Sequence, residues 1–295
     1  MAFIGLMSFL ANTYAASATN SGYFHGVLFK GEIENVRLHP TKGSSYVVAH
    51  GANDDLANLS MIEHADKLHL IMERGYPKQG PVTIDVYIND YRGITQRGHI
   101  PISGHGIYSR GLVLSANGDA NIDLSGHINL ANIHARGKTH IEMSGVHSRR
   151  SKIELFDQAY AKITGIVGVC DLNIHQRSCL IMHWVNASKL KFVLGDNAYV
   201  QLAGHVNLLD AELFERSKLA ARFLRSERTF VKTHDVSVAE ISTVRAQHTY
   251  ALDNSHIDYF NVPLYKTDLM VENGAVLDLR EWYLSSAQEN IYFEE

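Results

Sequence analysis

Residues 118–126 read GDANIDLSG, and the same nine-residue pattern returns at intervals of 19 or 20 residues. The copies are GKTHIEMSG (137–145), DQAYAKITG (157–165), QRSCLIMHW (176–184) and DNAYVQLAG (196–204). In each copy the third, fifth and seventh positions are small or apolar, and most positions between them are polar. This alternation is typical of a strand with one buried face. Its return at a fixed period predicts a solenoid, in which each coil covers the inner face of the next.

Three inward-facing columns follow from aligning the copies and extending the register to residue 241. The first column holds small residues: Ala120, Thr139, Ala159, Ser178, Ala198, Ser217 and Ser237. The second is mostly aliphatic: Ile122, Ile141, Ala161, Leu180, Val200, Leu219 and Ala239. The third is apolar: Leu124, Met143, Ile163, Met182, Leu202, Ala221 and Ile241. Glycine commonly follows two residues later, where it permits the positive φ of a corner.

Looser copies extend the pattern in both directions and give about ten coils over residues 96–284. The predicted fold is therefore all-β, a parallel β-helix with about 19–20 residues per coil. A propeller blade needs about twice this period, and helical repeats do not alternate every two residues. Residues 211–225 (AELFERSKLAARFLR) contain many strong helix formers. The column register continues through them and predicts strand, with an amphipathic helix as the alternative.

The first 20 residues have the pattern of a secretory signal peptide. An uncharged apolar run at 2–11 is followed by small residues, with cleavage expected near Ala15 or Ala18. A buried N-terminal helix is the alternative. Residues 21–95 lack the repeat and show short alternating strands separated by turn signals, which predicts an antiparallel β cap on the first coil. Residues 285–295 are assigned to a C-terminal tail.

Composition restricts the function. The formal net charge is −4, without the basic footprint of a general nucleic-acid binder. No stretch approaches the length of a membrane-spanning helix. The two cysteines, Cys170 and Cys179, are too few for a disulfide framework or a four-cysteine zinc site and are expected to be unpaired. The sequence predicts no cofactor.

The N-terminal segments FKGEIENVRLHPTKGSSYVVAHGANDDL, DKLHLIM and PVTIDVYI, with the Ser-Gly corners that follow them, resemble the head-GIN putative auto-transporter adhesin family. The resemblance covers about residues 24–245, although the family's paired SGSG corners are SGHG, SGHI and SGVH here. It implies a bacterial envelope or extracellular protein with a right-handed β-helix. It implies no catalytic residues.

Three groups of outward-facing residues are candidate sites. Asp123, Glu142 and Lys162 occupy equivalent positions on successive coils, where they could bind a cation or supply an acid and a base to a sugar chain. His134, Glu154 and His175, among 17 histidines, lie at spacings of 20 and 21 and could ligate Zn²⁺ or Cu²⁺. Arg222, Arg225 and Arg228 belong to the one basic stretch and could bind an anionic glycan or a lipid headgroup. For each group the alternative is a solvated or salt-bridged polar surface.

Three functions remain open from the sequence. The first is a non-enzymatic exported protein, periplasmic, outer-membrane-associated or extracellular, that binds a glycan or an envelope or host surface component. The second is a polysaccharide lyase or hydrolase that uses carboxylates such as Asp123 and Glu142. The third is a self-assembling scaffold resembling the bactofilins, which requires an uncapped terminal coil.

Overall fold

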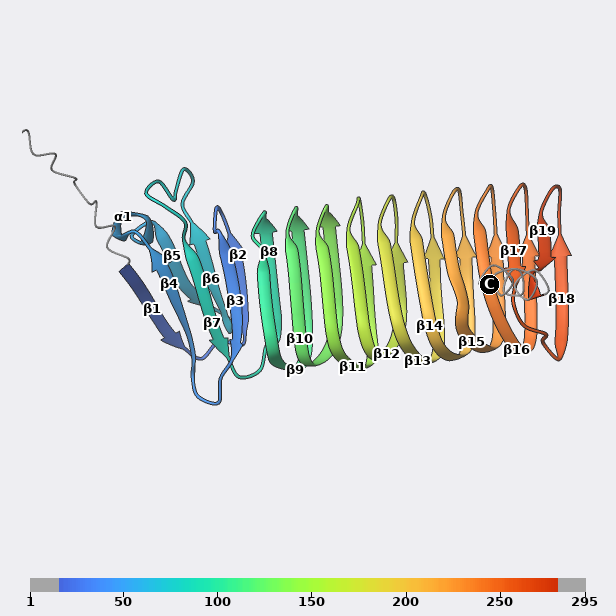
Figure 1. Ribbon diagram of the computed structural model, residues 1–295, viewed down its shortest axis with the longest axis horizontal. Helices are drawn as coiled ribbons and strands as arrows, with labels where there is room; N and C mark the ends of the chain where they lie inside the picture. The colour runs from blue at the N-terminus through green and yellow to red at the C-terminus, as the bar shows by residue number, and fades with distance from the viewer. Residues whose placement is uncertain (1–15, 281–295) are drawn as a thin grey trace, which may run out of the picture.

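The computed structural model describes residues 16–280, and nearly all of these residues belong to one 19-stranded sheet wound into a β-solenoid of about ten turns (Figure 1). Eight long strands form its body, and each pairs in parallel with the next. They are β9 (Ile102–Gly118), β10 (Asn121–Gly137), β11 (His140–Leu155), β12 (Tyr160–Ile174), β13 (Cys179–Leu194), β14 (Tyr199–Leu213), β15 (Lys218–Thr233) and β16 (Val238–Ala251).

Each long strand makes most of one coil because it bends once near its middle. We call the strand half before the bend the first face and the half after it the second face. The bends follow one another along the lower edge of the rod in Figure 1, and the tight turns between strands follow one another along the upper edge. We call these the bend edge and the turn edge.

The predicted columns form the core of the first face. Every one of their 21 members is buried, from Ala120 in β10's coil to Ile241 in β16. The register matches the alignment, because Ile122 pairs with Ile141 and Ile141 with Ala161. The strand prediction for residues 211–225 is also confirmed, since β14 ends at Leu213 and β15 begins at Lys218.

Side-chain oxygens join successive coils at the turn edge. The Asp157 carboxylate accepts the backbone N–H of Gly137, and Asp196 accepts that of Gln176. Asp235 likewise accepts the N–H of Glu215, at 2.8 Å. Because a solenoid coil contacts only its two neighbours, these hydrogen bonds fix the stacking of each coil directly.

The bend edge depends on residues with positive φ. The bends contain Gly106, Gly126, Gly145, Gly165, Trp184 and Gly204, with φ values of 67°, 146°, 72°, 141°, 66° and 137°. Two backbone conformations therefore alternate from coil to coil. Trp184 is the exception in residue type, because it adopts a left-handed conformation that favours glycine.

The parallel stack extends further toward the N-terminus than the sequence repeat does. β8 (Gly93–Gly98) pairs with β9 and with β2 (Gly26–Lys30), and β2 pairs with β6 (Lys67–Met72). On the other face, β3 (Asn35–Pro40) pairs with β9 and with β7 (Thr83–Ile88). The coil made by β2 and β3 thus lies between coils that come later in the chain.

Antiparallel pairs close the N-terminal end, as predicted. β4 (Ser45–Gly51) lies between β7 and β1 (Ala16–Gly22), and β5 (Leu59–His64) pairs with β6. Within residues 16–280 the one helix is α1 (Asn53–Leu56), and no described helix is long and apolar enough to cross a bilayer. Most of the predicted signal segment, residues 1–15, lies outside the described residues. β1 begins directly after it, so cleavage after Ala15 would leave this strand whole.

The C-terminal end has no comparable antiparallel layer among the described residues. β17 (His256–Tyr259) and β18 (Tyr265–Met270) pair with the two halves of β16, and β19 (Ala275–Asp278) pairs with β17. The predicted tail, 285–295, lies outside the described residues.

Candidate functional site

The first predicted group is assembled as expected but is not enclosed. Asp123 pairs in register with Glu142, and Glu142 with Lys162, on β10, β11 and β12. They border a shallow hollow of about 180 Å³ on the first face. Glu142 also contacts His140, with Oε1 3.3 Å from Nε2. The three residues therefore form an open row of charges on adjacent strands.

The predicted metal set needs correction, because the structure brings together only two of its three members. The His134 Nδ1 lies 3.3 Å from Glu154 Oε2, but Glu154 pairs in register with Asn173 rather than with His175. His175 lies one column further on, stacked on Phe156 at 6.0 Å. Successive coils differ by one residue in length, so equal spacing in sequence does not place the third side chain in the same column.

The surroundings of His134 also occupy its ring nitrogens. Nε2 receives the Arg136 Nε–H at 3.2 Å, so Nδ1 is the nitrogen that donates to Glu154. A hydrogen bond from Lys152 lowers the pKa of Glu154. No group of three or more His, Cys, Asp or Glu side chains within residues 16–280 is arranged to hold a metal ion.

The basic stretch is divided by the bend of β15. Arg222 lies at the bend, 4.8 Å above the Phe223 ring, whereas Arg225 and Arg228 are exposed on the second face. Glu227 between them contacts His205, with Oε1 3.8 Å from Nε2. The three arginines therefore do not converge on one hollow.

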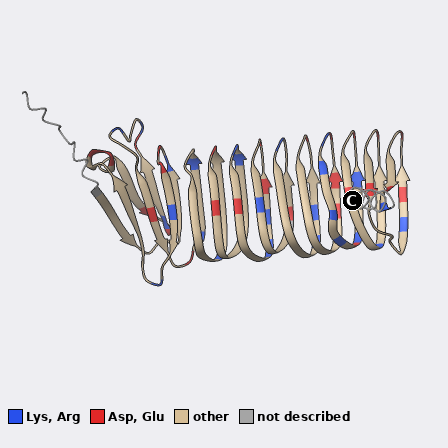
Figure 2. Ribbon diagram, viewed as in Figure 1, with Lys and Arg blue, Asp and Glu red and all other residues tan. Residues whose placement is uncertain are grey.

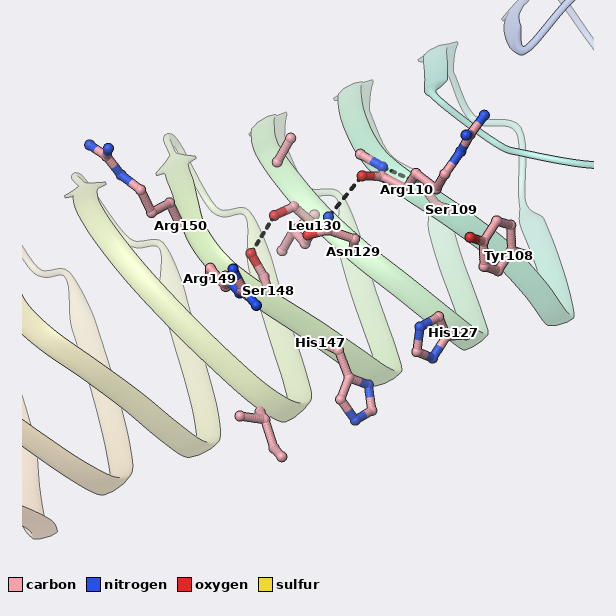
Figure 3. Close-up of a pocket in the computed structure, with 13 residues that line it drawn as sticks. Tyr108, Ser109, Arg110, His127, Asn129, Leu130, His147, Ser148, Arg149 and Arg150 are labelled. Atoms are coloured by element: carbon pink, nitrogen blue, oxygen red, sulfur yellow. Dashed lines mark hydrogen bonds between the residues drawn. The ribbon is translucent and has the colours of Figure 1, made fainter.

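A larger hollow, of about 620 Å³, lies on the second face of β9–β12 (Figure 3). We call it the arginine hollow, after Arg110, Arg149 and Arg150. Tyr108, His127 and His147 line its side nearest the bend edge, and the arginines line the opposite side.

Bulges between neighbouring strands create this hollow. Ala131 has no partner residue on β9, because Leu130 pairs with Leu112 and Asn132 with Val113. On the next interface Arg149 and Arg150 together oppose only Gly168. A Cβ at Gly168 would lie 2.3 Å from the Arg149 carbonyl oxygen, so glycine permits the close approach of the bulge. Bulges re-aim side chains, and here they turn two arginines outward.

The ring side of the hollow is a stack. The Tyr108 and His127 ring centroids are 5.9 Å apart, and those of His127 and His147 are 5.3 Å apart. Hydrogen bonds to the strand backbone fix the floor, because Asn129 Nδ2 donates to the Arg110 carbonyl and Ser148 Oγ to the Leu130 carbonyl (Figure 3).

The hollow is strongly cationic at its surface. None of its lining residues is acidic, although the whole chain carries a formal charge of −4 and residues of both signs are spread along the rod (Figure 2). The nearest carboxylate we identify is Asp90, which lies beneath Arg110 and is almost fully buried. Its oxygens accept the backbone N–H and Nε–H of Arg110, both at 2.9 Å.

Sequence reasoning missed this site, although a signal was present. Gly145 and Ile153 are eight positions apart, whereas Gly126 and Ile133 are seven apart. This extra residue, together with the adjacent pair Arg149-Arg150, marks a cationic bulge. The column alignment concentrated on the first face and did not use it.

Two buried carboxylates near the N-terminal coils make stability sensitive to acid. Burial alone would raise the pKa of Asp85, but hydrogen bonds from His39 and Arg37 outweigh it and lower the pKa. Asp90 behaves likewise, with Arg110 and Arg92 outweighing burial.

A carboxyl whose pKa is lower in the folded state stabilises the fold above its unfolded pKa, and the stabilisation is lost as pH falls through the folded value. We therefore expect the free energy of unfolding to fall as the pH drops below about 4. Urea unfolding at several pH values will measure the slope, and Asp85→Asn should flatten it. An unchanged slope in that variant would contradict the assignment.

The comparisons with known proteins agree with the resemblance seen in the sequence. Residues 34–164 match the model of the family described as "Putative auto-transporter adhesin, head GIN domain", which confirms the resemblance over this range. No curated protein matches the chain.

Similar solved structures cover nearly the whole chain at low identity. A putative adhesin from Parabacteroides distasonis is 10% identical, with a TM-score of 0.47, over 90% of this chain and 98% of that one. A putative adhesin from Parabacteroides merdae is 10% identical, with a TM-score of 0.43, over 90% and 97%. A putative lipid binding protein from Parabacteroides distasonis is 8% identical, with a TM-score of 0.43, over 90% and 97%.

Proposed function

We propose that this chain, whose residues 34–164 match the head GIN domain of auto-transporter adhesins, is an exported, non-enzymatic protein that binds an anionic glycan in the arginine hollow. The observation that carries the proposal is the composition of that hollow. Three arginines and two histidines line it without an acidic residue, in a chain of net negative charge. The hollow also lies entirely within coils of β9–β12, and most of these coils fall inside the range that matches the family.

The chemistry of the lining suits a carboxylated or sulfated saccharide. The planar guanidinium group can donate two parallel hydrogen bonds to a carboxylate or sulfate. Asp90 holds Arg110 from behind, with Oδ2 2.9 Å from Nη2, and so restricts its orientation before a ligand binds. Rings and small residues supply the apolar part of the surface, as in most ligand sites.

The arrangement favours binding over cleavage of a glycan. Glycoside hydrolysis ordinarily needs two carboxyl groups on either side of the scissile bond. The arginine hollow has none among its lining residues. The Asp123 and Glu142 pair lies on the first face, on the other side of the bend, beside a hollow less than a third as large.

Export is the part of the proposal that rests on the sequence and the family. The apolar run at 2–11 and the small residues after it fit a signal peptide, and the family description is that of an adhesin. Cleavage after Ala15 would leave β1 in place against β4.

We expect the double variant Arg149→Glu/Arg150→Glu to weaken binding of oligogalacturonate by at least about ten-fold, because two attractive charges become repulsive at an open site. Calorimetry or biolayer interferometry will measure this loss. Binding to the original protein should also weaken as salt is raised, since exposed charges are screened.

The matched control is Arg177→Glu/Arg216→Glu, which makes the same charge change at two exposed residues of the turn edge. It should retain binding. A neutral oligosaccharide of equal length should bind weakly to all three proteins. Equal losses in both double variants would show a general charge effect and refute the assignment to the hollow.

A further inference from the structure

Trp184 has a backbone conformation that is unfavourable for its residue type. Its φ is 66°, and the other five bends of this series have glycine. Among residues 16–280 it is the one aromatic residue with positive φ. Its side chain is nonetheless 72% exposed, so packing in the core does not explain it. Strained conformations of this kind concentrate at functional sites.

Trp184 belongs to a row of exposed apolar residues along the bend edge. Ile166 on β12 is 54% exposed and Phe223 on β15 is 61% exposed. Ala203 pairs with Phe223 and fills the position between the tryptophan and the phenylalanine. We call Ile166, Trp184, Ala203 and Phe223 the bend ridge. Strand spacing gives it a length of about 14 Å, in a straight line parallel to the rod.

Cationic side chains flank the bend ridge. Arg222 lies 4.8 Å above the Phe223 ring, and Arg225 is exposed two positions after that phenylalanine. Lys189 is exposed on the second face of β13, with Nζ 4.0 Å from Asp210 Oδ2. The combination is an apolar line that projects from the molecule, with positive charge beside it.

We propose that the bend ridge docks the rod on an anionic lipid surface. Trp184 and Phe223 enter the interface between headgroups, where aromatic side chains are favoured. Arg222, Arg225 and Lys189 then face the lipid phosphates, which attract basic residues at close range. The ridge is convex and straight, which fits a flat surface better than a glycan or a peptide that needs a groove. Trp184 and Phe223 lie outside the arginine hollow, so this second site goes beyond the proposed glycan binding.

The test uses the full chain and vesicles of phosphatidylcholine with phosphatidylglycerol, compared with phosphatidylcholine alone. We expect co-sedimentation with the anionic vesicles, and roughly ten-fold weaker binding for Trp184→Gly. Glycine suits the local φ, so this variant should keep its melting temperature. Trp184→Asn is the second variant, because asparagine also tolerates the left-handed region.

Val236→Ser is the matched control, since Val236 is an exposed apolar residue of the turn edge. It should bind vesicles normally, and Trp184→Gly should bind oligogalacturonate normally. The proposal fails if the original protein does not bind anionic vesicles, if both Trp184 variants bind them unchanged, or if Val236→Ser loses as much. Equal binding to both vesicle types would overturn the role of the cations.

Discussion

Replacing Gly165 with alanine should destabilise the protein by about 3 kcal/mol or more. A Cβ at this bend would lie 2.0 Å from the Val146 carbonyl oxygen and 2.6 Å from the Val146 nitrogen. Both are backbone atoms of the neighbouring coil, so no side-chain rotation can relieve the contact. The φ of 141° adds strain, because residues with a side chain rarely adopt it. Thermal and urea unfolding of the two proteins will measure the loss.

Two controls separate bend geometry from a general effect of removing glycine. A Cβ at Gly43 would have no neighbouring atom closer than 3.9 Å, so Gly43→Ala should change stability by less than about 1 kcal/mol. Trp184→Gly should also stay within about 1 kcal/mol, since relief of left-handed strain offsets the greater freedom of glycine in the unfolded chain. A stable Gly165→Ala variant would show that the coils can separate at the bend, contrary to the packing described above.

Leu180→Ala should cost about 2–5 kcal/mol, as expected for a fully buried leucine whose neighbours cannot close the cavity. Leu180 lies on β13 between Ala161 and Val200 in register, with no exposed surface. Its two neighbouring coils are fixed by backbone hydrogen bonds on both sides, which limits their collapse into the space. Denaturant unfolding will give the difference in the free energy of unfolding.

The control is the next residue of the same strand. Ile181 points to the outer side of the sheet and is partly exposed, so Ile181→Ala should cost under about 1.5 kcal/mol. Similar losses at the two positions would contradict the predicted alternation of inward and outward side chains.

The periodicity of the sequence determined the body of the fold. A two-residue alternation repeated every 19 or 20 residues can bury its apolar side only if the copies stack, and every residue of the three predicted columns is buried. The same register decided residues 211–225, where helix propensity pointed to a different structure. Burial in a repeating core outweighs intrinsic propensity.

The sites were less predictable. Asp123, Glu142 and Lys162 were placed correctly because they lie in the regular half of the coil. His175 was placed in the wrong column, because one extra residue per coil shifts the register of the second face. The arginine hollow arises from the same irregularity, since a bulge changes which side chains point outward.

Local sequence thus specified the strands, the core and the turn edge, because these depend on contacts between residues one coil apart. Only the tertiary structure decided the rest. It placed β2 and β3 between coils that follow them in the chain, through pairings of segments more than 40 residues apart. It also joined bulges from four strands into one cationic hollow and aligned Trp184 with Phe223 on one edge. These features depend on the register of neighbouring coils, which a single strand's sequence does not contain.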